Sequence, residues 1–222
     1  MLSKIARTIT RPFDERFDAV ERFRESLLGK SVPQHAKRYY YCFGGIAFFL
    51  FLIQAITGML LTLYYVPSVD QAYSSTFYIS NYVNYGWLIR SVHSWSAQLM
   101  FIFVVLHMIR VYVTASYKHP RELNWVAGMV LLIATMASLL TGNLLPWDQK
   151  AYWGSTVVVS LAEKIPLIGK PFSYIIMGGN KIGQATLTRF FSAHILLLPA
   201  GMIVFMGTHF WMVRKQGISE PL

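Results

Sequence analysis

The chain has 222 residues, of which 55% are hydrophobic and only 14% carry a charged side chain. Soluble proteins contain about 25% charged residues, so this composition excludes an ordinary soluble domain and indicates an integral membrane protein. The net charge of +10 does not indicate nucleic-acid binding, because the basic residues lie at the ends of apolar runs. Anionic groups at a membrane surface favour that placement, and we expect no nucleic-acid partner.

Residues 1–38 are mixed in charge and form the first predicted segment. Apolar residues recur there at helical spacing, at Phe13, Phe17, Val20, Phe23 and Leu27. The pattern predicts a helix on the membrane surface or, equally, a solvated helix that contacts another subunit. We assign residues 1–38 to an N-terminal surface segment and residues 39–222 to one helical domain.

Four long apolar runs follow, and each approaches or exceeds the roughly 20 residues that a helix needs to cross a membrane. They occupy residues 39–69, 90–117, 123–147 and 190–213. Two shorter apolar runs, 151–162 and 172–179, predict interfacial helices between the third and fourth spans. The predicted fold class is therefore an all-α integral membrane protein, a bundle of four transmembrane helices.

The distribution of lysine and arginine predicts the orientation of this bundle. Nine of these residues lie in residues 1–38, two between the second and third spans, and two in the C-terminal tail, whereas residues 63–89 contain none. Four more lie between the third and fourth spans. The positive-inside rule then predicts that both termini lie on the n-side, the side of the cytoplasm or its equivalent. The opposite side is called the p-side.

The second and fourth spans each carry two histidines, His93 with His107 and His194 with His209. On an α-helix the 14-residue step turns through about 1,400°, close to four full turns, and rises about 21 Å, and the 15-residue step leaves about +60°. A histidine inside a membrane is costly and indicates function. Each helix presents two imidazoles on one stripe, one near each membrane edge. This geometry favours two stacked bis-histidine haems.

Topology predicts how these histidines pair. Both histidine-bearing spans run from the p-side to the n-side, so His93 pairs with His194 and His107 pairs with His209. Crossed pairs would lie about 21 Å apart along the bundle. One alternative is that the histidines form hydrogen bonds between helices without any cofactor. Zinc is a weaker rival, because each level offers two ligands where a zinc site usually has four.

The first and third spans carry glycines at the levels of the histidines. Each span has two, 14 residues apart: Gly44 and Gly58, then Gly128 and Gly142. A missing side chain lets a helix approach a flat macrocycle closely, so these glycines are candidate haem contacts. Glycine is also common where membrane helices pack together, which is the alternative interpretation.

Arginines lie just outside the histidines along the chain. They are Arg90, Arg110, Arg189 and Arg214. A guanidinium group binds carboxylates well, so these residues are candidate partners for haem propionates at the membrane edge. The alternative is that they are helix-end anchors whose charged groups reach out to water.

Several motifs together resemble the cytochrome b6 family, the four-helix cytochromes b of b6f-type quinol oxidoreductases. The motifs are GWLIRSVHSWSA, LHMIRVY, KHPRELNWVAG, GNLLPWDQKAYWG, GQATLTRFFSAH and RKQGISEPL, and the similarity extends from about Val32 to the last residue. The resemblance implies that His93 and His194 ligate a low-potential haem b. It implies that His107 and His209 ligate a high-potential haem b.

The resemblance also implies a function and a set of partners. The chain would be the dihaem subunit of a quinol:cytochrome c or plastocyanin oxidoreductase, inactive alone, whose Q-cycle carries electrons from p-side quinol to n-side quinone and translocates protons. The implied partners are a subunit IV-like protein with the second half of cytochrome b, a Rieske iron–sulfur protein and a c-type cytochrome. The complex would be dimeric, in a bacterial cytoplasmic or thylakoid membrane. A dihaem anchor of another respiratory dehydrogenase or hydrogenase is the alternative.

Three further features follow from the resemblance. Tyr152, Trp153 and Gly154 match a surface helix that lines half of the quinol-oxidation pocket, although an aromatic interface belt is the alternative. The motif YYYCFGG resembles the site where b6-type proteins attach a haem c through one thioether bond, here at Cys42; a small buried hydrophobe is the alternative. There is no C-x-x-C-H motif for ordinary attachment. Ser94 stands where plant-type members usually have arginine, which removes one p-side cation that the family pattern implies. The N-terminus is several residues longer, which suggests a bacterial menaquinol version.

Overall fold

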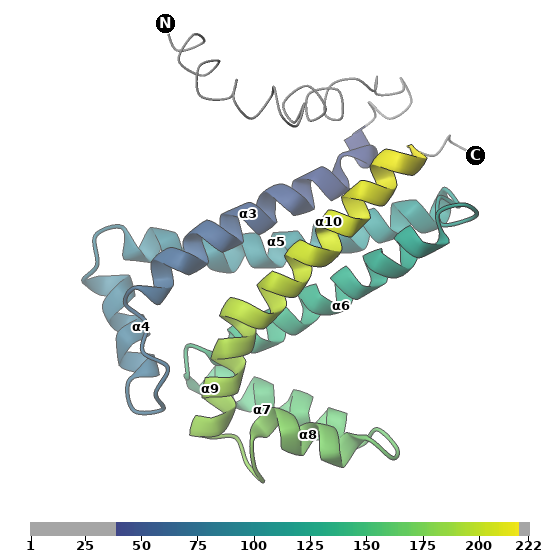
Figure 1. Cartoon of the computed structure of the whole chain (residues 1–222). Helices are drawn as coiled ribbons and strands as arrows, with labels where there is room; N and C mark the ends of the chain where they lie inside the picture. Colours follow the sequence, from purple (N-terminus) through teal and green to yellow (C-terminus); the bar gives the residue numbers. More distant parts are fainter. Residues whose placement is uncertain (1–38, 218–222) are drawn as a thin grey trace, which may run out of the picture. The chain divides into compact units, whose positions relative to one another are not determined.

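The computed structural model describes residues 39–217, and the chain divides into two units, Met1–Arg38 and Tyr39–Leu222. The predicted N-terminal surface helix lies in residues 1–38, outside the described residues. Residues 39–217 form helices and no strand (Figure 1). The elements are η2 (Tyr39–Tyr41), α3 (Phe43–Thr62), α4 (Ala72–Asn81), α5 (Gly86–Val113), α6 (Glu122–Leu144), α7 (Gln149–Glu163), α8 (Gly169–Met177), α9 (Gln184–Ser192), η3 (Ala193–Leu197) and α10 (Leu198–Gln216).

Four helical segments within residues 39–217 are long and apolar enough to cross a membrane. They are Phe43–Thr62, Gly86–Val113, Glu122–Leu144 and Gln184–Gln216. The last segment runs without a break through α9, η3 and α10. The predicted class, an all-α membrane protein with four spans and short helices between the third and fourth, is confirmed, with α7 and α8 as the short helices.

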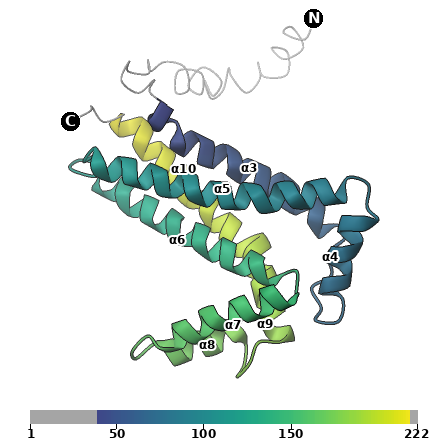
Figure 2. The same cartoon turned by 180° about the vertical axis from the view of Figure 1, so that it is seen from behind.

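The four spans associate as two antiparallel pairs, α3 with α5 and α6 with α10 (Figures 1 and 2). A buried apolar cluster joins three of the spans. Its members are Leu50 and Phe51 from α3, Met100 from α5, and Met202 and Met206 from α10. Because α3 and α6 each lead away from the same end of the bundle, α5 and α10 both return to it and run in the same direction.

One hydrogen bond between neighbouring segments marks each end of the bundle. At the end where α3 begins and α10 finishes, Gln216 Nε2 donates to the Pro120 carbonyl at 2.8 Å. We call this the termini end. At the opposite end, the hydroxyl of Tyr65 donates to the Leu145 carbonyl at 2.7 Å, and burial raises its pKa, so the donor stays protonated. We call this the loop end, and α4, α7 and α8 lie there (Figure 1).

Helix α4 was not predicted, because its sequence AYSSTFYISN has no long apolar run. Its hydroxyl groups bond to the carbonyls one turn earlier, Thr76 to Ala72 at 2.8 Å and Ser80 to Thr76 at 3.0 Å. Ala72 and Ile79 bury one side of the helix. These bonds satisfy the hydroxyl groups within the helix, so the sequence carries no apolar periodicity that would have predicted it.

The fourth span contains one π-helical turn, η3, in which the Leu198 amide donates to the Ala193 carbonyl five residues earlier. Pro199 follows directly, and in a regular α-helix its ring would collide with the Ile195 carbonyl. A π turn moves that carbonyl away and takes up one additional residue. The 15-residue step from His194 to His209 therefore keeps nearly the rotation of the 14-residue step in α5.

Candidate functional site

The structure brings the four histidines together as two pairs, the same pairs that the topology predicts. At the loop end the ring centroids of His93 and His194 are 6.3 Å apart, with 74° between the planes. At the termini end those of His107 and His209 are 6.4 Å apart, at 78°. With metal–nitrogen bonds of about 2.1 Å, two nitrogens on opposite sides of one metal ion lie about 4 Å apart and the ring centres about 6 Å apart. The spacing at both levels fits a bis-imidazole metal site.

Gly44, Gly58, Gly128 and Gly142 are called the level glycines, and each lies against one of these imidazoles. A Cβ atom built on Gly44 would lie 3.1 Å from His107 Cε1, and one on Gly58 would lie 3.2 Å from His93 Cε1. The corresponding distances in the other helix pair are 3.7 Å from Gly128 to His209 and 2.7 Å from Gly142 to His194. The nearest atoms outside each glycine's own helix belong to histidine rings, and the expected contact with a macrocycle stays a prediction. The level glycines let the rings lie close to the neighbouring helix backbone.

Two threonines that the sequence interpretation missed contact the histidines at the loop end. Thr57 Oγ1 lies 2.8 Å from His93 Nδ1, and Thr141 Oγ1 lies 3.2 Å from His194 Nδ1. At the termini end, the Nδ1 atoms of His107 and His209 are buried and meet no side-chain partner within residues 39–217, although the Asn124 carbonyl lies beside His209. The signal that could have found the threonines is their position, since each precedes a level glycine.

Two of the four arginines predicted to bind propionates have partners in the short helices of the loop end. Arg90 donates to the Ser80 hydroxyl at 3.0 Å, and Arg189 donates to the Ile175 carbonyl. Arg110 lies over the ring of Tyr41 at 3.8 Å, and Arg214 lies in the last turn of α10. Arg90 and Arg189 therefore fasten α4 and α8 to the spans in this structure.

Cys42 precedes α3 directly and is exposed, which is not the packing of a small buried hydrophobe. Gly44, two residues further along, lies against His107. The thiol therefore lies near the level of the termini-end pair. Among residues 39–217, no group of three or more His, Cys, Asp or Glu could hold a metal ion by itself.

The predicted quinol-pocket residues lie in α7 at the loop end. Asp148 starts this helix, and its carboxylate accepts from the Ala151 amide at 2.7 Å. The Tyr152 ring centroid lies 5.2 Å from that of Trp153, whose exposed indole donates to Gln149 Oε1 at 2.9 Å. A Cβ on Gly154 would meet no atom within 4 Å. Trp153 and Gly154 are therefore exposed on this helix, whereas the half-buried Tyr152 packs against the cluster around Leu144.

Comparison with known proteins agrees with the resemblance. Residues 27–217 match the family described as Cytochrome b/b6/petB. The chain is 49% identical to cytochrome b6 of Desmonostoc sp. over 210 residues, which cover 95% of this chain and 97% of that protein. Cytochrome b6 of Mastigocladus laminosus is 47% identical, with the same coverage.

A chain of the solved structure "Hyperthermophilic respiratory Complex III" superimposes with a TM-score of 0.84 and 32% sequence identity. The match covers 96% of this chain but only 56% of the longer chain in that structure. The family match extends over most of the chain, and the cytochromes b6 are alike in sequence along nearly their full length. The chain therefore belongs to the cytochrome b/b6 family.

Proposed function

We propose that this cytochrome b chain carries electrons across a membrane as a subunit of a bc-type quinol oxidoreductase complex. The observation that carries the proposal is the presence of two imidazole pairs, with centroids 6.3 and 6.4 Å apart, at two levels of one bundle. The complex III neighbour, similar over 96% of this chain, supports the same class of complex. Electrons would pass from quinol at the p-side toward quinone at the n-side.

The residues at the two levels fit haem b. His93 with His194, and His107 with His209, would fill both axial positions of two haem groups, which supply one-electron transfer when bound. The glycines leave room for the imidazoles beside the helix backbone. Between the levels, the apolar cluster around Phe51 and Met100 excludes water. Residues 39–222 would thus form one dihaem domain.

Replacement of the histidines tests this assignment. His93→Leu and His194→Leu should each remove the same component from the reduced-minus-oxidised visible spectrum of the purified complex. His107→Leu and His209→Leu should each remove the other component, because ligands on one level serve one haem. A wild-type complex without haem would overturn the proposed function, and so would loss of the same component in His93→Leu and His209→Leu.

Cys42 is proposed to hold a third haem through a single thioether bond. The support is its exposure, its place before α3 near the His107–His209 level, and the YYYCFGG motif. After acid-acetone extraction, a denaturing gel stained for haem peroxidase activity should still show this chain. Cys42→Ser should lose the stain and keep both haem b components. An unstained wild-type band would contradict the attachment.

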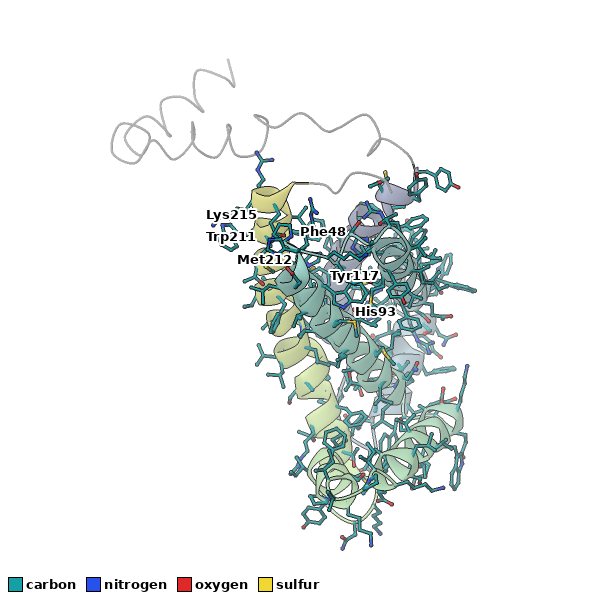
Figure 3. The ribbon with its side chains drawn as sticks, turned by 90° about the vertical axis from the view of Figure 1, so that its right-hand side faces the viewer. Phe48, His93, Tyr117, Trp211, Met212 and Lys215 are labelled. Carbon is teal, nitrogen blue, oxygen red and sulfur yellow. The ribbon has the colours of Figure 1, made fainter. Side chains whose placement is uncertain are left out.

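The loop end is proposed to face the p-side and the termini end the n-side. The termini end carries the basic C-terminal tail and the loop with Lys118 and Arg121, as the positive-inside rule requires. There, Lys215 lies over the Trp211 ring at 5.1 Å (Figure 3), a pair suited to a membrane interface. Both chain termini would then be on the n-side.

The surface of α7 around Tyr152, Trp153 and Gly154 is proposed to form half of the quinol-oxidation site. Residues 39–217 leave Trp153 and Gly154 uncovered, so another subunit would have to close the pocket. We assign that role to a subunit IV-like protein. A Rieske protein and a c-type cytochrome would accept the electrons on the p-side. Activity and proton translocation would therefore require the whole complex.

A further inference from the structure

We infer that Thr57 and Thr141 are positioning residues that lower the redox potential of the loop-end haem. Each hydroxyl accepts a hydrogen bond from the Nδ1–H of the adjacent histidine, His93 or His194. The inference rests on the proposed haem function and gives a structural cause for a difference in potential between the two levels. Neither threonine contacts the metal position itself.

The direction of the hydrogen bonds follows from the single proton of each hydroxyl. Thr57 Oγ1 donates to the Ile53 carbonyl at 2.6 Å, and Thr141 Oγ1 donates to the Ala137 carbonyl at 2.8 Å. Both protons are used in these helix bonds, so the hydroxyl oxygens can only accept from the imidazoles. The proton of each ring is thereby fixed on Nδ1, and the lone pair of Nε2 is left for the metal.

Among residues 39–217, the termini end lacks this arrangement. The residues before the level glycines are Phe43 and Ala127 there, and neither side chain can accept a hydrogen bond. Within residues 39–217, the Nδ1 atoms of His107 and His209 meet no hydroxyl or other side-chain partner.

Backbone carbonyls do not account for this difference between the levels. The carbonyl of Ser138 lies beside His194 at the loop end, and that of Asn124 lies beside His209 at the termini end. Each belongs to the residue four positions before a level glycine of α6. A threonine hydroxyl beside Nδ1, in contrast, is present only at the loop end in the part of the chain that the structure describes.

The hydrogen bonds act on the metal through the ligand. An acceptor at Nδ1–H raises the basicity of the imidazole, and a more basic ligand favours the oxidised, more positive iron. Thr57 and Thr141 are buried, and a low local dielectric strengthens the bond. The loop-end potential is lowered relative to the termini end. Electron movement from p-side to n-side is then favourable and offsets part of the work against the membrane potential.

Valine substitution removes the hydroxyl while nearly keeping the shape of threonine. In the assembled complex, Thr57→Val and Thr141→Val should raise the midpoint potential of the low-potential component alone. The loss of one hydrogen bond predicts roughly a threefold to tenfold change in the oxidised-to-reduced ratio at fixed ambient potential. Tenfold corresponds to about 59 mV for a one-electron couple. Thr57→Ser and Thr141→Ser keep the acceptor and should retain the wild-type potential.

The chain offers a matched control and a reciprocal test. Thr135 is buried in α6, and its hydroxyl bonds to the Leu131 carbonyl at 2.8 Å. Thr135→Val should leave both potentials unchanged. Ala127→Thr introduces a hydroxyl before Gly128, beside His209, and should lower the potential of the other component. A general packing disturbance would not produce shifts of opposite sign at the two levels.

The outcomes separate this inference from the proposed function. A complex without two haem b components would overturn the function itself. Two intact components whose potentials move no more in the valine variants than in Thr135→Val would overturn the inference and leave the function standing. An equal shift of both components, or no recovery with serine, would overturn it too. If the valine variants fail to assemble, Ala127→Thr decides, and an unchanged or raised potential rejects the inference.

Discussion

Among the four glycines, Gly142 has the least room for a side chain. An added Cβ would lie 2.7 Å from His194 Cε1, a contact that forces a shift, and the Thr141 hydroxyl holds the same ring. Overpacking of this kind destabilises by about 1–3 kcal/mol. Gly142→Ala should therefore weaken or abolish the loop-end haem while the other component remains. The reduced-minus-oxidised spectrum, with haem content per chain, measures this.

Gly128 provides the comparison within the same helix. A Cβ there would be 3.7 Å from His209 Cε1, which is ordinary van der Waals contact, so Gly128→Ala should keep both haems. Gly201→Ala, with no atom within 4 Å, is the control. If Gly128→Ala lost its haem and Gly142→Ala did not, the imidazole contacts would not be the reason for these glycines.

At the scale of residues, spacing predicted the levels but not the contacts. His93 and His107, 14 residues apart, show their common stripe in the sequence alone, because helical rotation is fixed. The role of Thr57 was hidden, since a membrane threonine commonly bonds to its own helix and the second partner depends on how α3 packs on α5. The bond from Arg189 to α8 likewise depends on the folded loop end.

At the scale of elements, the π turn η3 explains the longer histidine step in the fourth span. Deletion of Leu196, an exposed residue within the turn, leaves the 14 residues that separate His93 from His107. Combined with Pro199→Ala, which removes the clash that favours a π turn, it should give a regular helix. We expect both haem components to persist, measured in the visible spectrum.

Deletion of exposed Val204 in the same Pro199→Ala background is the matched control. This deletion also leaves a 14-residue step. If the π turn remains, His209 turns by about 100° relative to the preceding helix. If the π turn becomes regular helix, the segment with buried Met202 turns instead. One haem or the core packing should be lost. Equal tolerance of the two deletions would show that η3 does not absorb the additional residue.

The transmembrane elements were predictable because length and hydropathy define a span without reference to its neighbours. The elements that could not be predicted, α4 and η3, depend on tertiary contacts. Helix α4 is rich in polar and aromatic residues and is fixed by buried Ala72 and Ile79. In η3, the sequence showed the additional residue but not whether the helix would rotate or widen to accommodate it.

At the scale of the whole molecule, the two bundle ends differ in charge. The loop connecting α3 to α5 at the loop end contains no lysine or arginine between residues 63 and 89. The termini end carries Lys118, Arg121, Arg214 and Lys215. Four lysines between α6 and α9 oppose this trend, and they lie in a connection short enough to count in the positive-inside rule. The loop between α3 and α5, the loop between α5 and α6 and the C-terminal tail together predict that the termini end faces the n-side.

Single cysteines at exposed positions test this orientation. Tyr73 at the loop end and Lys118 at the termini end are both exposed, and Cys42→Ser supplies a background in which the native thiol is absent. In sealed vesicles of known sidedness, a membrane-impermeant maleimide should label Tyr73→Cys only from the p-side and Lys118→Cys only from the n-side. Labelling after detergent permeabilisation controls for the reactivity of each thiol. If both positions reacted from the same face, the antiparallel pairing of the spans would be wrong. If each reacted from the face opposite to the one expected, the bundle would be inverted, and the His107–His209 level and Cys42 would lie on the p-side.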